Sequence, residues 1–140
     1  MNPDRPEAPS GTELRRRARA EALPFLAALA LPDPAETVRA WTQHLPTARS
    51  AAQVHVLLDA LTGTDTSTLL ALRDVLRTAG SWCREHGQPA LAERYLRAGD
   101  LLDIADRQLY PLGIDLLTAF HAQASAPGRP AERNIPAEPQ

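Results

Sequence analysis

The sequence of 140 residues contains no lysine, since all 15 of its Lys and Arg positions are arginine. Lysine forms Schiff bases with carbonyl substrates, anchors pyridoxal phosphate and contacts nucleotide phosphates in Walker-type loops. The chain therefore lacks the residue on which these chemistries depend. We expect no cofactor.

Cysteine and aromatic residues are also scarce. Cys83 is the single cysteine and cannot form a disulfide within the chain, which favours a reducing compartment. There are two residues each of Trp, Tyr and Phe, so a core must be built from Leu, Ala and Val. We expect such a core to be thin, because small side chains bury little apolar area. The formal net charge of -2 argues against general nucleic-acid binding and leaves a local basic patch as the alternative.

Long apolar runs are absent as well, and no stretch approaches the roughly 18 residues that cross a bilayer. The basic residues at 15–19 and the apolar run at 22–31 share features with an export signal, and Ala28-Leu29-Ala30 has the spacing of a cleavage site. Glu13 and Glu21 do not fit such a signal, and an amphipathic helix explains the same residues. We therefore expect a cytoplasmic protein, with secretion as the alternative.

Proline is concentrated at the two ends of the chain, with three prolines in residues 1–9 and four in residues 125–140. These ends hold too few apolar residues to offset the entropy lost on ordering them. We predict disordered tails at 1–9 and 125–140 and one helical bundle domain at 10–124.

Between these ends every apolar pattern has the period of a helix, and no stretch alternates as a strand would. The sequence predicts an all-α fold, a compact bundle of five to six antiparallel helices. Ser10 and Asp33 have the positions of N-caps, while Gly63 and Gly87 are expected just past the ends of two further helices.

Internal prolines predict interruptions of two helices. Pro24 is expected to kink or split the first helix. Pro111 and Gly113 are expected to end the helix that begins near Gln88, leaving a short last helix that includes Phe120.

Apolar residues follow one stripe on each of the two helices that flank Gly87. The stripes consist of Leu69, Leu72, Leu76, Ala79 and Cys83 before it and Leu91, Tyr95, Ala98, Leu102 and Leu109 after it.

The stretch around Gly87 resembles one tetratricopeptide-type helix pair, through Ala79, Gly80, Gly87, Ala92 and Leu96. The resemblance implies closely touching helices, stacked in that family into a peptide-binding groove. Cys83 stands where the family usually has an aromatic residue, and no second copy occurs at the expected period. A generic antiparallel helix hairpin explains the same residues, and we favour it.

Arg39 and His44 have the spacing of the catalytic pair in HEPN-type ribonucleases, which this segment resembles. The resemblance implies His44 as a general base and Arg39 as the group that stabilises charge on the phosphate. Ala40 stands where that family usually has a polar residue. The alternative is that His44 is an exposed residue in the last turn of a helix.

Two other clusters have structural explanations that we favour. Cys83 and His86 share one helix face, but a zinc site needs about four ligands, so we expect no metal. Asp100, Asp103 and Asp106 recur every three residues near arginines, as on the ion-paired outer face of a helix.

A local charge imbalance remains in the first helix, at Arg15, Arg16, Arg17 and Arg19. Cations in a first turn oppose the helix dipole, so an anionic partner is one interpretation and a solvated basic face is the other. Trp41, Trp82 and Tyr95 are candidate anchors for a protein partner. We expect a small non-enzymatic interaction or regulatory protein that binds a protein partner or itself. The alternative is a nucleic-acid-associated module, either a binder through the basic arm or an Arg39/His44 ribonuclease.

Overall fold

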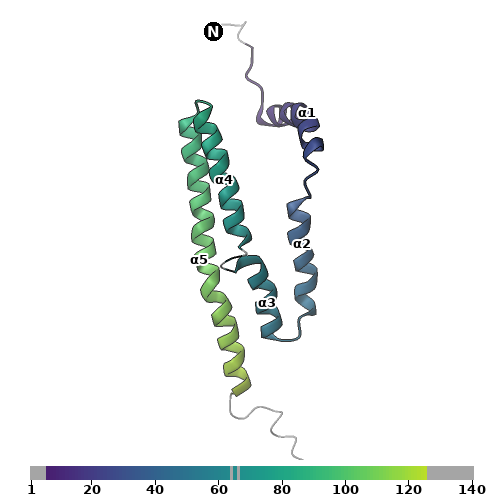
Figure 1. Cartoon of the computed structure of the whole chain (residues 1–140), viewed down its shortest axis with the longest axis vertical. Helices are drawn as coiled ribbons and strands as arrows, with labels where there is room; N and C mark the ends of the chain where they lie inside the picture. Colours follow the sequence, from purple (N-terminus) through teal and green to yellow (C-terminus); the bar gives the residue numbers. More distant parts are fainter. Residues whose placement is uncertain (1–5, 64, 66, 126–140) are drawn as a thin grey trace, which may run out of the picture. The chain divides into compact units, whose positions relative to one another are not determined.

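The computed structural model describes residues 6–63, 65 and 67–125. This part of the chain holds five α-helices, one short 3-10 helix and no strand, so the predicted all-α fold is confirmed with five helices (Figure 1). The chain divides into two units, residues 1–40 and residues 41–140. The helices are α1 (Gly11–Leu29), α2 (Pro34–His44), η1 (Leu45–Thr47), α3 (Ala51–Thr62), α4 (Thr68–Glu85) and α5 (Pro89–Ser125).

The predicted tails fall largely on residues 1–5 and 126–140, which lie outside the described residues. Residues 6–9 precede α1 without helical structure, and Ser125 is the last residue of α5.

Side-chain caps fix where the helices begin. Ser10 Oγ accepts a hydrogen bond from the Glu13 amide at 3.2 Å, and Asp33 Oδ1 accepts one from the Ala35 amide at 2.9 Å. Both predicted N-caps are therefore confirmed, because each side chain satisfies a backbone donor that the first turn leaves free.

The two internal prolines do not end their helices. Pro24 lies inside α1, so the predicted split of that helix does not occur. Pro111 and Gly113 lie inside α5, so the predicted break and the separate last helix are wrong. A proline removes one backbone hydrogen bond and disfavours helix, but tertiary packing can outweigh that local preference. For Pro111 this packing is that of α3 on α5 around Gly113, whereas α1 has no buried residue and no packing explains why it continues through Pro24.

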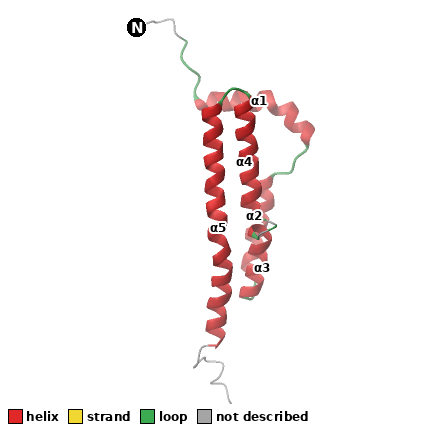
Figure 2. Cartoon of the chain, turned by 60° about the vertical axis from the view of Figure 1, so that its left-hand side comes forward, coloured by secondary structure: helices red, strands yellow, loops and turns green. Residues whose placement is uncertain are grey.

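Helices α4 and α5 form a hairpin closed by Gly87, whose φ of 78° is in the left-handed region that glycine adopts readily. Ser67, at the start of α4, hydrogen-bonds Asp106, whereas Gly80, near its other end, lies against Ala92. The two helices therefore run in opposite directions, side by side in both views (Figures 1 and 2).

The seam of this hairpin is made by small residues. A Cβ atom added at Gly80 would stand 3.2 Å from the Ala92 carbonyl oxygen, and one at Gly99 would stand 3.5 Å from Arg73 Cγ. Ala92 is fully buried and Cys83 is 6% exposed. Small residues let the two backbones approach closely, which leaves most leucines of the two helices beside the seam, while Leu96 lies against Gly80.

Helix α3 packs against the C-terminal half of α5, which extends beyond α4 (Figure 2). A Cβ atom at Gly113 would stand 3.0 Å from His55 Cε1, so α3 approaches α5 closely at this point. Helices α4 and α3 thus follow one another along α5.

Candidate interaction surface

The α4–α5 hairpin has two chemically different sides. Successive residues of a helix are about 100° apart, so the residues before and after each seam residue lie on opposite sides of the seam. The seam positions are 73 and 80 on α4 and 92 and 99 on α5. The residues that follow them are polar: Asp74, Ser81, Glu93 and Asp100. The residues that precede them are apolar: Leu72, Ala79, Leu91 and Ala98.

Ion pairs between α4 and α5 occupy the polar side. Arg84 Nη2 lies 2.8 Å from Glu93 Oε1, and Arg77 Nη2 lies 3.6 Å from Asp100 Oδ1. These pairs show that the polar rows of both helices share one side of the hairpin. The apolar rows therefore share the other side.

Asp103 is the centre of this charged network. Its carboxylate lies 3.0 Å from Arg73, 3.7 Å from Arg77 and 3.5 Å from Arg107. Hydrogen bonding to Asp74, together with hydrogen bonding and charge from Asp103, raises the pKa of the Arg73 guanidinium above its ordinary value. The arginine therefore stays protonated in its interhelix ion pair with Asp103.

On the other side, apolar residues of α5 are spaced alternately by four and three residues over 26 positions. This is the heptad spacing of helices that pack lengthwise against other helices. The shorter row on α4 has the same alternation. We call these two rows together the apolar face: Leu69, Leu72, Leu76, Ala79 and Cys83 of α4, with Leu91, Tyr95, Ala98, Leu102, Ala105, Leu109, Leu112 and Leu116 of α5.

The apolar face is partly exposed to solvent. Leu72, Leu91 and Leu112 are exposed, whereas Cys83 is buried and the remaining residues are half-buried. The face continues onto α3, because Val54 and Leu58 line a groove of about 510 Å³ together with α5 residues from Leu109 to Leu116. None of the residues that define the face is charged, but Arg94 lies beside Leu91 and Asp115 lines the groove beside Leu116.

The three predicted aromatic anchors lie in different environments. Tyr95 belongs to the apolar face, and its Cβ lies beside Gly80 of the seam. Trp82 is exposed on α4 and stacks on His86, with the ring centroids 3.9 Å apart. Trp41 lies on α2 and is half-buried. The structure therefore places Tyr95 directly on the candidate surface and Trp82 on the same hairpin.

The four predicted arginines of α1 are all exposed, but they do not act as one cluster. Arg17 Nη2 lies 2.7 Å from Glu13 Oε1 and is therefore ion-paired. Arg15, Arg16 and Arg19 line one surface pocket of about 280 Å³ together with Thr12. Three of the four arginines thus form a local basic surface on one side of the helix.

The other candidate residues show no convergent chemistry. Arg39 and His44 both lie on α2 and both are exposed. His86 Nδ1 lies 2.8 Å from the Trp82 carbonyl oxygen, and Cys83 is buried. Among the residues that the structure describes, no group of three His, Cys, Asp or Glu side chains is placed to hold a metal ion.

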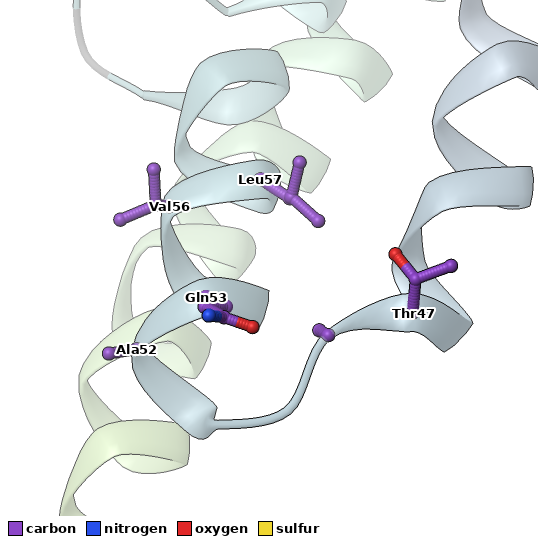
Figure 3. A pocket seen from close by; sticks show the side chains of 6 residues that line it. Thr47, Ala52, Gln53, Val56 and Leu57 are labelled. Carbon is purple, nitrogen blue, oxygen red and sulfur yellow. The ribbon is translucent and has the colours of Figure 1, made fainter.

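A further pocket of about 440 Å³ lies between the turn after α2 and the first turns of α3 (Figure 3). Thr47, Ala52, Val56 and Leu57 line it, together with Ala48 and Gln53. Gln53 Oε1 accepts a hydrogen bond from the Arg49 amide at 2.8 Å, so its carbonyl oxygen is already engaged. No titratable side chain lines this pocket, and it is therefore an apolar depression rather than a catalytic site.

The sequence predicted only part of the apolar face. It identified the row from Leu91 to Leu109 but ended the helix at Pro111, and so missed Leu112 and Leu116 as members of the same row. The alternation of three and four residues continues through Pro111, and this signal would have extended the row.

Comparison of the chain with protein-family models, curated proteins and solved structures gives no match. Within the described part of the chain, no helix combines the length and the apolar character needed to cross a membrane.

Proposed function

We propose that this chain is a helical interaction protein whose apolar face binds a partner made of helices. A single observation carries the proposal: the α5 row keeps its heptad spacing from Leu91 to Leu116 while Leu72, Leu91 and Leu112 remain exposed. We further place the protein in the cytoplasm, in keeping with its single cysteine.

The chemistry of the surface supports a helical occupant. Burying exposed leucines gains roughly 25 cal/mol per Å² of apolar area. No residue of the two rows carries a charge that would have to be desolvated, and the charged Arg94 and Asp115 lie at the border of the α5 row. Side chains at heptad spacing pack into the holes between four residues of a facing helix. An extended or globular ligand would not match this period along the whole row.

A photocrosslinking residue introduced at single positions tests this proposal in cells. Position 112 lies on the apolar face and Leu112 is 57% exposed. Position 104 lies one helical turn after Asp100, on the ion-paired side, and Ile104 is 50% exposed. We expect a defined protein–protein crosslink from position 112 and none from position 104. Equal crosslinking from both positions, or none from position 112, would contradict the proposed function.

The basic surface of α1 supports a second candidate function, contact with nucleic-acid phosphates. Arg15, Arg16 and Arg19 share one pocket, and no ion pair engages Arg15 or Arg19 among the described residues. Replacing these three arginines by glutamine should flatten the salt dependence of duplex DNA binding, since each released phosphate contact lowers the slope. Arg17→Gln is the matched control, because Arg17 is paired with Glu13. A salt slope that the triple replacement leaves unchanged would remove this candidate.

A further inference from the structure

We propose that the occupant of the apolar face is a second copy of this chain, so that two α4–α5 hairpins pack face to face. This inference rests on the proposed function and names its partner. In the resulting dimer, each apolar row would face the rows of the other copy, as in a four-helix bundle.

The length of the apolar row favours α5 of a second copy over the other helices of this chain as its partner. The row runs from Leu91 to Leu116, which is about 39 Å at a rise of 1.5 Å per residue. A partner must offer an apolar row of comparable length to cover it. Helix α5 of a second copy, with 37 residues, provides this, whereas α1 has 19 residues and α2 has 11.

The size of the face agrees with the requirement of a stable dimer. The α5 row is about 39 Å long and the α4 row, from Leu69 to Cys83, is about 22 Å long, so at about 10 Å of width per helix the face covers roughly 600 Å² per copy. Standard protein–protein interfaces bury about 1,200 to 2,000 Å² in total, which is about 600 Å² per partner at the lower end. The face is therefore large enough to hold two copies together.

Charge distribution also favours a second copy. The ion-paired side chains of the hairpin, such as Arg84 with Glu93 and Arg73 with Asp103, lie on the opposite side and would remain in water when the apolar faces meet. Two charged residues border the face near opposite ends of the α5 row, Arg94 beside Leu91 and Asp115 beside Leu116. In an antiparallel pair of α5 helices Arg94 of one copy would lie near Asp115 of the other, so two copies bring opposite charges together.

Sedimentation equilibrium of the full chain tests the inference, with charge substitutions at matched positions. Leu112→Glu and, independently, Leu72→Glu place a carboxylate on the apolar face, while Ile104→Glu places one on the ion-paired side. We expect the unsubstituted chain to be a dimer and each face variant to raise the dimer dissociation constant roughly 100-fold or more, because a buried unpaired charge is strongly unfavourable. Ile104→Glu should change it by less than about threefold, as surface substitutions usually do.

Circular dichroism of each variant separates loss of association from loss of folding, and the two face variants lie on different helices. A chain that stays monomeric at every concentration would overturn the inference, as would a dimer that neither Leu112→Glu nor Leu72→Glu weakens. The photocrosslink from position 112 distinguishes this failure from that of the proposed function. A crosslink to another protein overturns the second copy but leaves the function standing, and no crosslink overturns both.

Discussion

Gly80 of α4 and Ala92 of α5 lie so close together that a Cβ atom at Gly80 would stand 3.2 Å from the Ala92 carbonyl oxygen. This contact involves backbone on the α5 side, which cannot rotate away as a side chain can. It places the seam of the hairpin on small residues. The leucines at heptad spacing consequently lie beside the seam, where they form the apolar face, whereas Leu96 lies against Gly80.

Substitutions at two seam glycines should have opposite effects. Gly80→Val should lower the free energy of unfolding by about 2 kcal/mol, because the added methyl groups meet α5 backbone. Gly99→Ala should raise it by up to about 1 kcal/mol, since its Cβ would lie at an ordinary contact distance of 3.5 Å and alanine favours helix. Urea unfolding followed by circular dichroism measures both changes. A destabilised Gly99→Ala variant would show that the seam is tighter than described.

Ser67 should matter more than an ordinary helix cap. Its Oγ accepts from the Leu70 amide at 3.2 Å and donates to Asp106 Oδ1 at 2.5 Å, so it links α4 to α5. Ser67→Ala should cost about 2 to 3 kcal/mol, the sum of a cap and a hydrogen bond to a charged group. Ser50, which only caps α3, is the control and should cost about 1 kcal/mol. Equal losses for the two variants would argue against the link between Ser67 and Asp106.

Pro111 should be a source of instability within α5. Proline lacks the amide that would bond the Arg107 carbonyl, and it disfavours a helix interior by about 3 kcal/mol relative to alanine. Pro111→Ala should therefore raise the melting temperature and stabilise the protein by up to about 3 kcal/mol. A lower melting temperature in this variant would mean that the continuous helix through residue 111 is wrong.

Arg39 and His44 are expected to have no catalytic role. The purified protein should not cleave unstructured RNA above background, and Arg39→Ala and His44→Ala should leave that background unchanged. Cleavage that is abolished by either substitution would instead support the ribonuclease interpretation. Gel electrophoresis of a labelled RNA, without added metal, gives the answer.

Local signals explain how much of the fold could be predicted from the sequence. Ser10 and Asp33 were identifiable as caps because capping depends on a few neighbouring residues. Pro111 disfavours a helix locally and therefore predicts a break. In the structure α5 continues through Pro111 and packs against α3 around Gly113. Because α5 is continuous, the described residues form five α-helices and not six. A contact between residues 55 and 113 cannot be inferred from the residues next to Pro111.

The candidate site illustrates the same limit. The leucine rows were visible as periodic patterns, but the sequence does not say which side of each helix faces the other. The facing sides are set by three small residues, Gly80, Gly99 and Ala92. The two helices approach closely at these residues instead of packing their leucine rows against each other. The exposure of the apolar face therefore became visible only with the hairpin in place.

Hydroxyl-radical footprinting of the two tyrosines tests the central claim most directly, because it requires no substitution. Tyr95 belongs to the apolar face, whereas Tyr110 is 68% exposed and lies with Asp106 and Arg107 on the other side of α5. As the concentration of the protein rises and copies associate, oxidation of Tyr95 should fall while oxidation of Tyr110 stays constant. Oxidation of Tyr95 that stays as constant as that of Tyr110 across the concentration series would contradict the account.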